Sequence, residues 1–285
     1  NYIVVSSLLA PVGITLGQEA GLIVPRIAVH LFVFYFGIMA DVTPPVGLAS
    51  FAAAAVSGGD PIRTGFVAFA YSLRTAALPF LFIFNTDLLL IDVTWVEGIQ
   101  VFIISTIAML VFTAATQGYF FSRSRLYESA LLLLVAFSLF RPGFWMDRIV
   151  APYEMVQPDA VVQTLGDVAP GTELRFWIDG FDAVGNPRSF VTQLPLGEGA
   201  SGFDRLSATG VELLKDGDRL IVDYVGFDSA AEKAGFAFDQ RITGVQVPVD
   251  QPPQELIYIP ALGLLFLIAM IQRRRRPEEP APEAA

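Results

Sequence analysis

The sequence predicts a polytopic α-helical membrane protein that carries one small soluble domain of mostly β structure. Three observations lead to this prediction. The 285 residues are 54% hydrophobic and include 24 phenylalanines, which is typical of helical membrane proteins. Several apolar runs have the length of a membrane-spanning helix. Between Trp145 and Gln254 the composition changes, because Gly, Pro and Asp become common and short runs typical of strands appear.

Apolar runs define the expected spans. The candidates are residues 2–16, 30–57, 64–84, 99–121, 126–140 and 256–272. A helix needs roughly 20 residues to cross the ~30 Å hydrocarbon core, so residues 99–121 suffice and residues 126–140 are short. Residues 30–57 are too many for one straight span. We therefore expect two half-helices here, joined by an unwound centre.

The centre of that long run reads ADVTPPVGLASF, residues 40–51. Pro44 and Pro45 lack an N–H, and a proline pushes the preceding residue out of the α region, so the helix must break. Gly47 lets the backbone approach another group closely. Unwound backbone at membrane depth is tolerated only where it is buried in protein or lines a cavity. The break is therefore predicted to be a binding site, as in other discontinuous membrane helices.

The residue types at the break indicate what it binds. Unpaired backbone carbonyls and the Thr43 hydroxyl are hard oxygen ligands for a small cation, which makes Thr43, Pro44 and Gly47 candidate ion-site residues. The second half-helix is expected to start near Pro45 and to direct its N-terminal N–H groups at the same place, which favours an anionic substrate. Thr43, Pro45, Gly47 and Asp41 are accordingly the substrate candidates.

Other interpretations of these residues stay open. The break can be a proline kink with only a packing role. Asp41 can be a functional intramembrane carboxylate, or it can cap the second half-helix. His30 can be a polar anchor at the membrane interface or part of a site.

The soluble region has the size of a normal domain. Its strand-like runs are residues 173–178, 189–193 and 219–225. Four arginines at residues 273–276 follow the last apolar run, so the positive-inside rule places the C-terminus in the cytoplasm and the soluble domain in a bacterial periplasm. The basic loop at residues 122–125 is again expected inside.

The expected domains follow from these boundaries. They are a membrane part at residues 1–145, a periplasmic mostly β domain at 146–254, a C-terminal transmembrane helix at 255–273 and a disordered cytoplasmic tail at 274–285.

One stretch resembles a known family. Residues 29–69, VHLFVFYFGIMADVTPPVGLASFAAAAVSGGDPIRTGFVAF, followed by YSLRTAALPFLFIFNTDLLL at 71–90, resemble the C-terminal part of the large permease subunit of TRAP transporters (tripartite ATP-independent periplasmic transporters). HLFVFYFG, TPPVG and DPIRTG occur together and in order. The resemblance covers about residues 1–145 and is strongest to the fused-permease branch that works with TAXI-type binding proteins. The rest resembles the uncharacterised C-terminal extension of some fused permeases.

This resemblance implies an elevator-type transporter fold with hairpins and broken helices in the bacterial inner membrane. It implies uptake of small organic anions, such as carboxylates or amino acids, coupled to Na⁺ and needing no covalent cofactor. The implied partners are a periplasmic TAXI-type solute-binding protein, the lipid bilayer and the first half of the permease, which is absent from this chain; nucleic acid is not expected. Thr43, Pro44, Pro45 and Gly47 match the family motif near the sodium and substrate sites.

A second resemblance lies in the soluble domain. DSAAEKAGFAFDQRI, residues 228–242, resembles the PDZ pattern of a short helix that leads into a turn and a strand. PDZ domains bind peptide ends by adding a strand to a sheet edge. Because no convincing carboxylate-binding loop is found, peptide recognition and a structural or docking role both stay open.

The competing function classes are a transporter, a membrane protease, and a membrane-anchored periplasmic PDZ-like scaffold or protease regulator. An enzyme is not expected. The chain has no cysteine and one histidine, and it lacks His-Glu-x-x-His, Gly-x-Gly-Asp and a serine with a plausible histidine partner. A scaffold function would not explain why the apolar run at residues 30–57 is interrupted.

Overall fold

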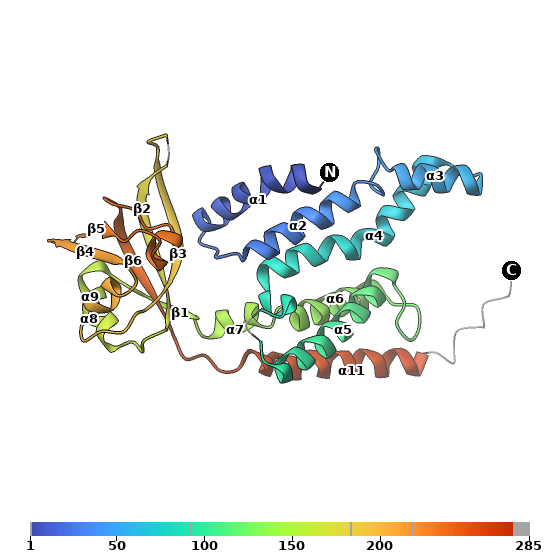
Figure 1. Ribbon diagram of the computed structural model, residues 1–285. Coiled ribbons are helices and arrows are strands. Elements are labelled where there is room, and N and C mark those ends of the chain that lie inside the picture. Colours follow the sequence, from blue (N-terminus) through green and yellow to red (C-terminus); the bar gives the residue numbers. More distant parts are fainter. Residues whose placement is uncertain (1, 92, 183, 218, 276–285) are drawn as a thin grey trace. The chain divides into compact units, whose positions relative to one another are not determined.

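The computed structural model describes residues 2–91, 93–182, 184–217 and 219–275 and divides into two compact units (Figure 1). The helical unit combines the described parts of Asn1–Ala10, Pro25–Val150 and Gln251–Ala285. The sheet unit combines Pro11–Val24 and Ala151–Asp250. The protein is thus mostly helical with one small sheet domain, as the sequence predicts.

The helices outside residues 151–250 follow one another along the chain, and the first of them is divided between the two units at residue 10. They are α1 (Tyr2–Glu19), α2 (Arg26–Met39), α3 (Leu48–Ser57), α4 (Pro61–Phe84), η1 (Thr86–Leu89), α5 (Trp95–Gln117), α6 (Leu126–Phe140), α7 (Gly143–Ile149), η2 (Gln254–Ile257) and α11 (Tyr258–Arg275). Local chemistry sets several ends. Asp60 caps α4 ahead of Pro61, and Thr94 with Glu97 forms a capping box at the start of α5.

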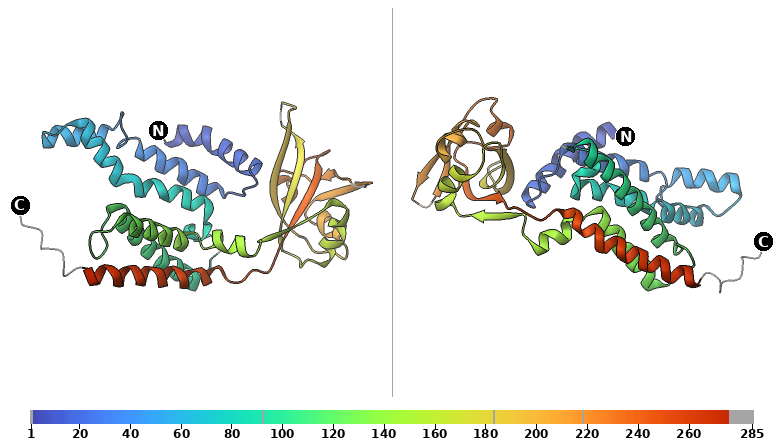
Figure 2. Two further views of the ribbon diagram at one scale, coloured as in Figure 1. Left: turned by 180° about the vertical axis from the view of Figure 1, so that it is seen from behind. Right: turned by 90° about the horizontal axis from the view of Figure 1, so that it is seen from below.

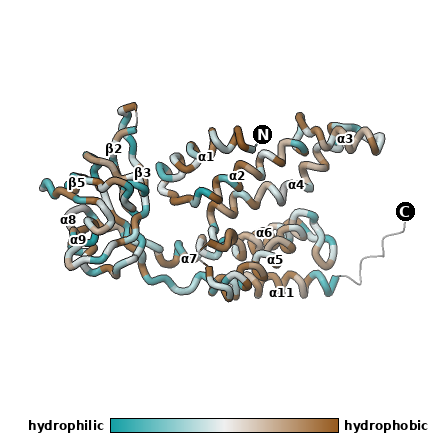
Figure 3. Tube along the Cα trace, viewed as in Figure 1, coloured by the Kyte–Doolittle hydropathy of each residue, from teal (hydrophilic) through white to brown (hydrophobic). Residues whose placement is uncertain are grey.

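Four helices of the described part of the chain are long and apolar enough to cross a membrane: α1, α4, α5 and the run from η2 through α11. Helices α6 and α7 together pass the same test but are bent by 81°. Hydrophobic residues predominate along these helices (Figure 3). Helices α2 and α3, of 14 and 10 residues, are too short to span alone. The expected pair of half-helices is therefore confirmed.

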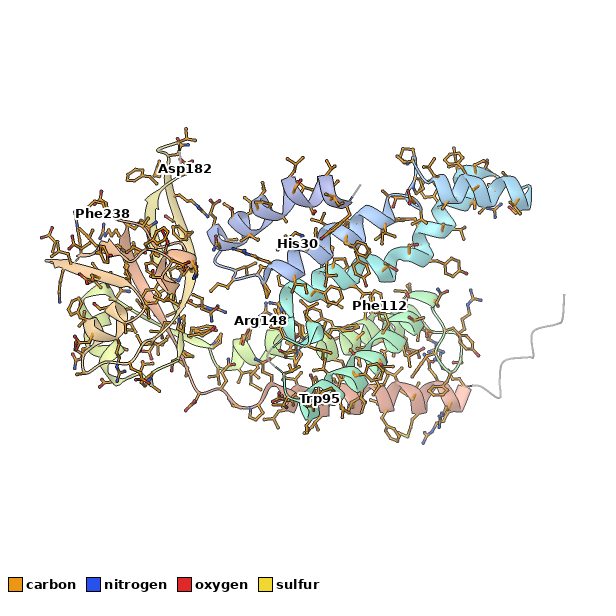
Figure 4. The ribbon with its side chains drawn as sticks, viewed as in Figure 1. His30, Trp95, Phe112, Arg148, Asp182 and Phe238 are labelled. Atoms are coloured by element: carbon orange, nitrogen blue, oxygen red, sulfur yellow. The ribbon has the colours of Figure 1, made fainter. Side chains whose placement is uncertain are left out.

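Helices α5, α6 and α11 form a bundle with its own apolar core. Ala108 and Val111 of α5 meet Leu132 and Ala136 of α6, and Ile268 of α11 closes the cluster. Phe112, labelled in Figure 4, packs against it. The small alanines let the helices approach closely, as is common in membrane bundles. The three helices lie side by side in both views of Figure 2.

A group of polar side chains, which we call the polar clasp, joins α11 to the start of α6. It consists of Glu128, which is 2% exposed, Gln272, which is 0% exposed, and Arg275. The Arg275 guanidinium lies 2.5 Å from the Glu128 carboxylate, and Gln272 Nε2 donates to that carboxylate at 2.9 Å. Gln272 also binds the α5–α6 loop, because its Oε1 accepts from the Phe121 N–H at 3.1 Å. The clasp therefore fixes the register of α11 against the other two helices.

The sheet domain contains six antiparallel strands: β1 (Tyr153–Val156), β2 (Glu173–Phe181), β3 (Pro187–Pro195), β4 (Val211–Asp216), β5 (Arg219–Val225) and β6 (Arg241–Pro248). Their order is β3-β2-β6-β5-β4, and β1 pairs with the end of β6 beside β5. The three predicted strand runs are thus confirmed as β2, β3 and β5. The short helix expected before the last strand is α10 (Ala230–Lys233).

Two further helices, α8 (Pro158–Asp167) and α9 (Gly202–Ser207), cover this sheet. The core includes Leu165 of α8, Leu206 of α9 and Phe176, whose ring packs edge-to-face on Phe236 at 5.4 Å. Helix α9 contacts both α8 and β4. At Gly202 a side chain would collide with the Val162 carbonyl of α8, so glycine is needed for this close approach.

The tip of the β2–β3 hairpin supplies a pH-dependent prediction. Hydrogen bonds from Asn186 and from the Val184 N–H hold the pKa of Asp182 below its usual range. Because the folded pKa is the lower one, this stabilisation is present above the unfolded pKa of about 3.9 and is lost as pH falls through the folded value. We expect the amides of Val184 and Asn186 to lose hydrogen-exchange protection in acid. Asp182→Asn should flatten this dependence, whereas exposed Asp223→Asn should leave it unchanged.

Candidate functional site

Residues 40–47 connect α2 to α3 as a series of turns. Helix α3 begins at Leu48 with Gly47 as its N-cap, so the expected start near Pro45 is wrong by three residues. The reason is local. Pro44 and Pro45 have no N–H to donate, and the Gly47 N–H closes a turn onto the Thr43 carbonyl at 2.9 Å. Gly47 has φ +23°, a conformation that side chains disfavour, so the chain can enter α3 only at the next residue.

The carbonyl groups of the break need partners, and several of them find a partner inside the protein. The Asp41 carbonyl accepts from the Ala49 N–H at 3.0 Å, and the Val42 carbonyl accepts from Ser50 Oγ at 3.4 Å. Thr43 Oγ1 donates to the Met39 carbonyl at 2.7 Å. The break is therefore a hydrogen-bonded structure. Since a carbonyl or hydroxyl oxygen has two lone pairs, these oxygens can still accept a further ligand.

A pocket of about 460 Å³ opens at this break. It brings together four of the five predicted site residues: Thr43, Pro44, Pro45 and Gly47. The remaining lining comes from α3 and from the first three turns of α4 and is mostly apolar. These residues are Ser50, Phe51, Pro61, Ile62, Gly65, Phe66 and Phe69. The lining of the pocket thus includes both hydroxyl-bearing residues and aromatic side chains.

Ser50 and Gly65 are site residues that the sequence reasoning missed. Ser50 is 3% exposed, lines the pocket and binds back to the break through Val42. Gly65 lets α4 pass close to the break, because a Cβ there would lie 3.1 Å from Pro44 Cγ and 3.8 Å from Ser50 Cβ. The signal for Gly65 was present in the DPIRTG motif, but only the packing of α3 on α4 shows which residues it faces.

Asp41 and His30 lie elsewhere. Asp41 is exposed and is not part of the pocket lining. It meets α3 through its backbone carbonyl, and α3 has no side-chain cap. His30, labelled in Figure 4, has its Nδ1 3.0 Å from the Tyr2 hydroxyl. This contact does not separate the two interpretations of His30, which stay predictions.

Each of the two parts of the chain matches a known protein family. Residues 98–278 match a family described as a domain of unknown function, DUF3394. The chain belongs to the DUF3394 family. Residues 1–99 match the DctM component of tripartite ATP-independent periplasmic transporters. No curated protein and no solved structure matches the chain.

The DctM match of residues 1–99 supports a role as a component of a TRAP-type transporter. Together with the apolar helices it indicates an integral membrane protein. The match thereby supports the predicted resemblance to the TRAP permease family for residues 1–99. The family is one of transporters, in agreement with the prediction that the chain is not an enzyme. It also implies a periplasmic solute-binding protein as partner. The pocket at the break lies within the part of the chain that matches DctM.

Proposed function

We propose that the chain acts in sodium-coupled import of small organic anions, such as carboxylates or amino acids, which a TAXI-type periplasmic binding protein delivers. The observation that carries this proposal is the pocket at the TPPVG break inside the DctM-like residues. Thr43, Pro44 and Gly47 are proposed to contribute to a Na⁺ site, and Thr43, Pro45 and Gly47 to contact the substrate. The proposed role of Asp41 is structural, because its backbone carbonyl accepts a hydrogen bond from Ala49 of α3.

The chemistry of the pocket suits such a cargo. Na⁺ is a hard cation that prefers neutral or anionic oxygen ligands, and the hydroxyls of Thr43 and Ser50 with the carbonyls of the break are of this kind. The N-terminus of α3 begins beside the pocket, and the positive end of its helix dipole favours an anion there. The aromatic wall formed by Phe51, Phe66 and Phe69 suits the carbon skeleton of an organic substrate.

We further propose an elevator-type mechanism in the bacterial inner membrane, in which this segment works with the first half of the permease. The mostly β domain predicted at residues 146–254 is proposed to be periplasmic and PDZ-like and to serve in docking. The C-terminal arginines support a cytoplasmic C-terminus. Within the tail predicted at 274–285, residues 276–285 lie outside the described part of the chain.

Sodium-dependent stability tests this function without knowledge of the substrate. A ligand that binds only the folded state stabilises it by RT ln(1 + [L]/Kd), about 2.7 kcal/mol at a hundredfold excess over Kd. We expect the full-length transporter in detergent to unfold at a higher temperature in Na⁺ than in K⁺ at equal ionic strength. Thr43→Ala should reduce this difference because it removes one oxygen from the site.

Thr116→Ala is the matched control. Thr116 Oγ1 also donates to the carbonyl four residues earlier, at 3.0 Å, but it lies on α5 outside the pocket. The control should keep the full difference between Na⁺ and K⁺. Equal unfolding temperatures in the two cations, or equal losses in both variants, would contradict a sodium site at the break.

A further inference from the structure

The polar clasp brings two basic segments to one end of the α5–α6–α11 bundle. Arg123 and Arg125 lie in the α5–α6 loop, and Arg273, Arg274 and Arg275 end α11, about 150 positions later in the chain. Figure 1 shows the C-terminal end of α11 beside this loop. The contact is specific, because Gln272 accepts from the backbone of Phe121 and donates to Ser124 Oγ at 3.1 Å. The two segments therefore form one surface, which we call the arginine cluster.

The charge of the arginine cluster is strongly positive. The two segments carry five arginines, and Glu128 is the carboxylate of the polar clasp. The net charge of these described side chains is therefore 5 − 1 = +4. Glu128 is buried and already pairs with Arg275. Arg123, Arg125, Arg273 and Arg274 are exposed. Arg273 stacks over the Phe121 ring at 4.3 Å, which holds its charge beside the loop.

The surroundings of the arginine cluster are apolar. Leu126, directly after the loop, is 92% exposed, and Ile271, just before the clasp, is 43% exposed. Farther back on α11, Phe266 is 65% exposed. Figure 3 shows the hydrophobic run of α11 turning hydrophilic at its end. A ligand at this end thus meets positive charge and hydrocarbon-facing side chains together, which is the arrangement that recognises a lipid headgroup at a membrane surface.

We propose that the arginine cluster binds the phosphate headgroups of anionic phospholipids and that the polar clasp assembles this site. A soluble anion would need only the charge, whereas a phospholipid uses the charge and the adjoining exposed apolar side chains. The same charges placed on two unconnected segments would attract lipid weakly and separately. Because Gln272 holds the two segments together, their charges can act on the same headgroup region.

Lipid binding by the purified full chain in a non-ionic detergent tests the proposal. Dioleoylphosphatidylglycerol and dioleoylphosphatidylcholine are titrated separately, and bound lipid is counted by native mass spectrometry. We expect at least tenfold tighter binding of the phosphatidylglycerol. Each arginine near a membrane surface contributes a factor of about 5, so Arg123→Gln/Arg125→Gln should weaken binding roughly 25-fold. Arg273→Gln/Arg274→Gln should weaken phosphatidylglycerol binding by the same factor.

The control pair is Arg63→Gln/Arg241→Gln. It removes the same charge from exposed positions of α4 and β6, and it should leave lipid binding unchanged. If the loop and helix arginines formed two independent sites, each pair would halve the number of bound lipids without weakening the rest, which would overturn a single assembled site.

Three other results would also overturn the proposal. They are equal affinity for the two lipids, equal losses in the control pair, and displacement of phosphatidylglycerol by inorganic phosphate at a similar concentration. The last result would indicate a site for soluble anions. None of these measurements depends on sodium or substrate, so they are independent of the proposed transport function.

Discussion

Arg275→Met is expected to lower the free energy of unfolding by about 3 kcal/mol, the lower end of the range for breaking a buried ion pair. The Glu128 side chain is 2% exposed and the Arg275 side chain 22% exposed. Removing the guanidinium leaves a buried carboxylate whose remaining hydrogen bonds within the described part of the chain include those from Gln272 and from the Arg125 N–H. Chemical denaturation of the purified protein, monitored by helix content, measures the loss.

Two further variants separate the ion pair from general effects. Arg274→Met makes the same change one residue earlier, at an exposed position, and should stay within about 0.5 kcal/mol of the parent. Glu128→Gln combined with Arg275→Met removes the buried charge while an amide oxygen still accepts from Gln272. This double variant should be more stable than Arg275→Met alone. The opposite order of stabilities would show that the ion pair does not hold α11.

Gly65→Leu is expected to reduce uptake by the complete transporter by roughly 100-fold, the loss that a displacement of about 1 Å at a site can cause. Gly65 lines the pocket, and a Cβ there already lies 3.1 Å from Pro44 Cγ. The longer leucine side chain therefore either fills the pocket or pushes the break away from α4. The sodium-dependent rise in unfolding temperature should disappear in the same variant.

Gly263→Leu provides the comparison for this prediction. It makes the same exchange within α11, where a Cβ meets nothing within 4 Å. Both exchanges raise helix propensity to a similar degree, so only the local packing differs. Gly263→Leu should keep uptake and the sodium response. Normal uptake by Gly65→Leu, with the protein present in the membrane at the parent level, would mean that the pocket is not on the transport path.

Much of the candidate site could be predicted from its sequence because prolines act locally. Two adjacent residues without an N–H cannot continue a helix, whatever surrounds them. This placed the break correctly between α2 and α3. The start of α3 at Leu48 could not be predicted in the same way, because it depends on the turn that Gly47 closes onto Thr43.

The hydrogen bonds of the break also escaped prediction. Asp41, Val42 and Met39 find their donors in α3 or in Thr43. Which donor reaches which carbonyl depends on the path of the chain through residues 40–47. The sequence indicates only that such groups must be satisfied somewhere.

The sequence by itself determined the membrane class of the protein, the position of the break and the β character of the soluble domain. Each of these follows from composition or from the chemistry of neighbouring residues. Only the tertiary structure decided that Gly65 and Ser50 line the pocket and that Gln272 joins the two arginine segments. Hydrophobicity and helix breaking are local properties, whereas a contact between residues 121 and 272 depends on how whole helices pack.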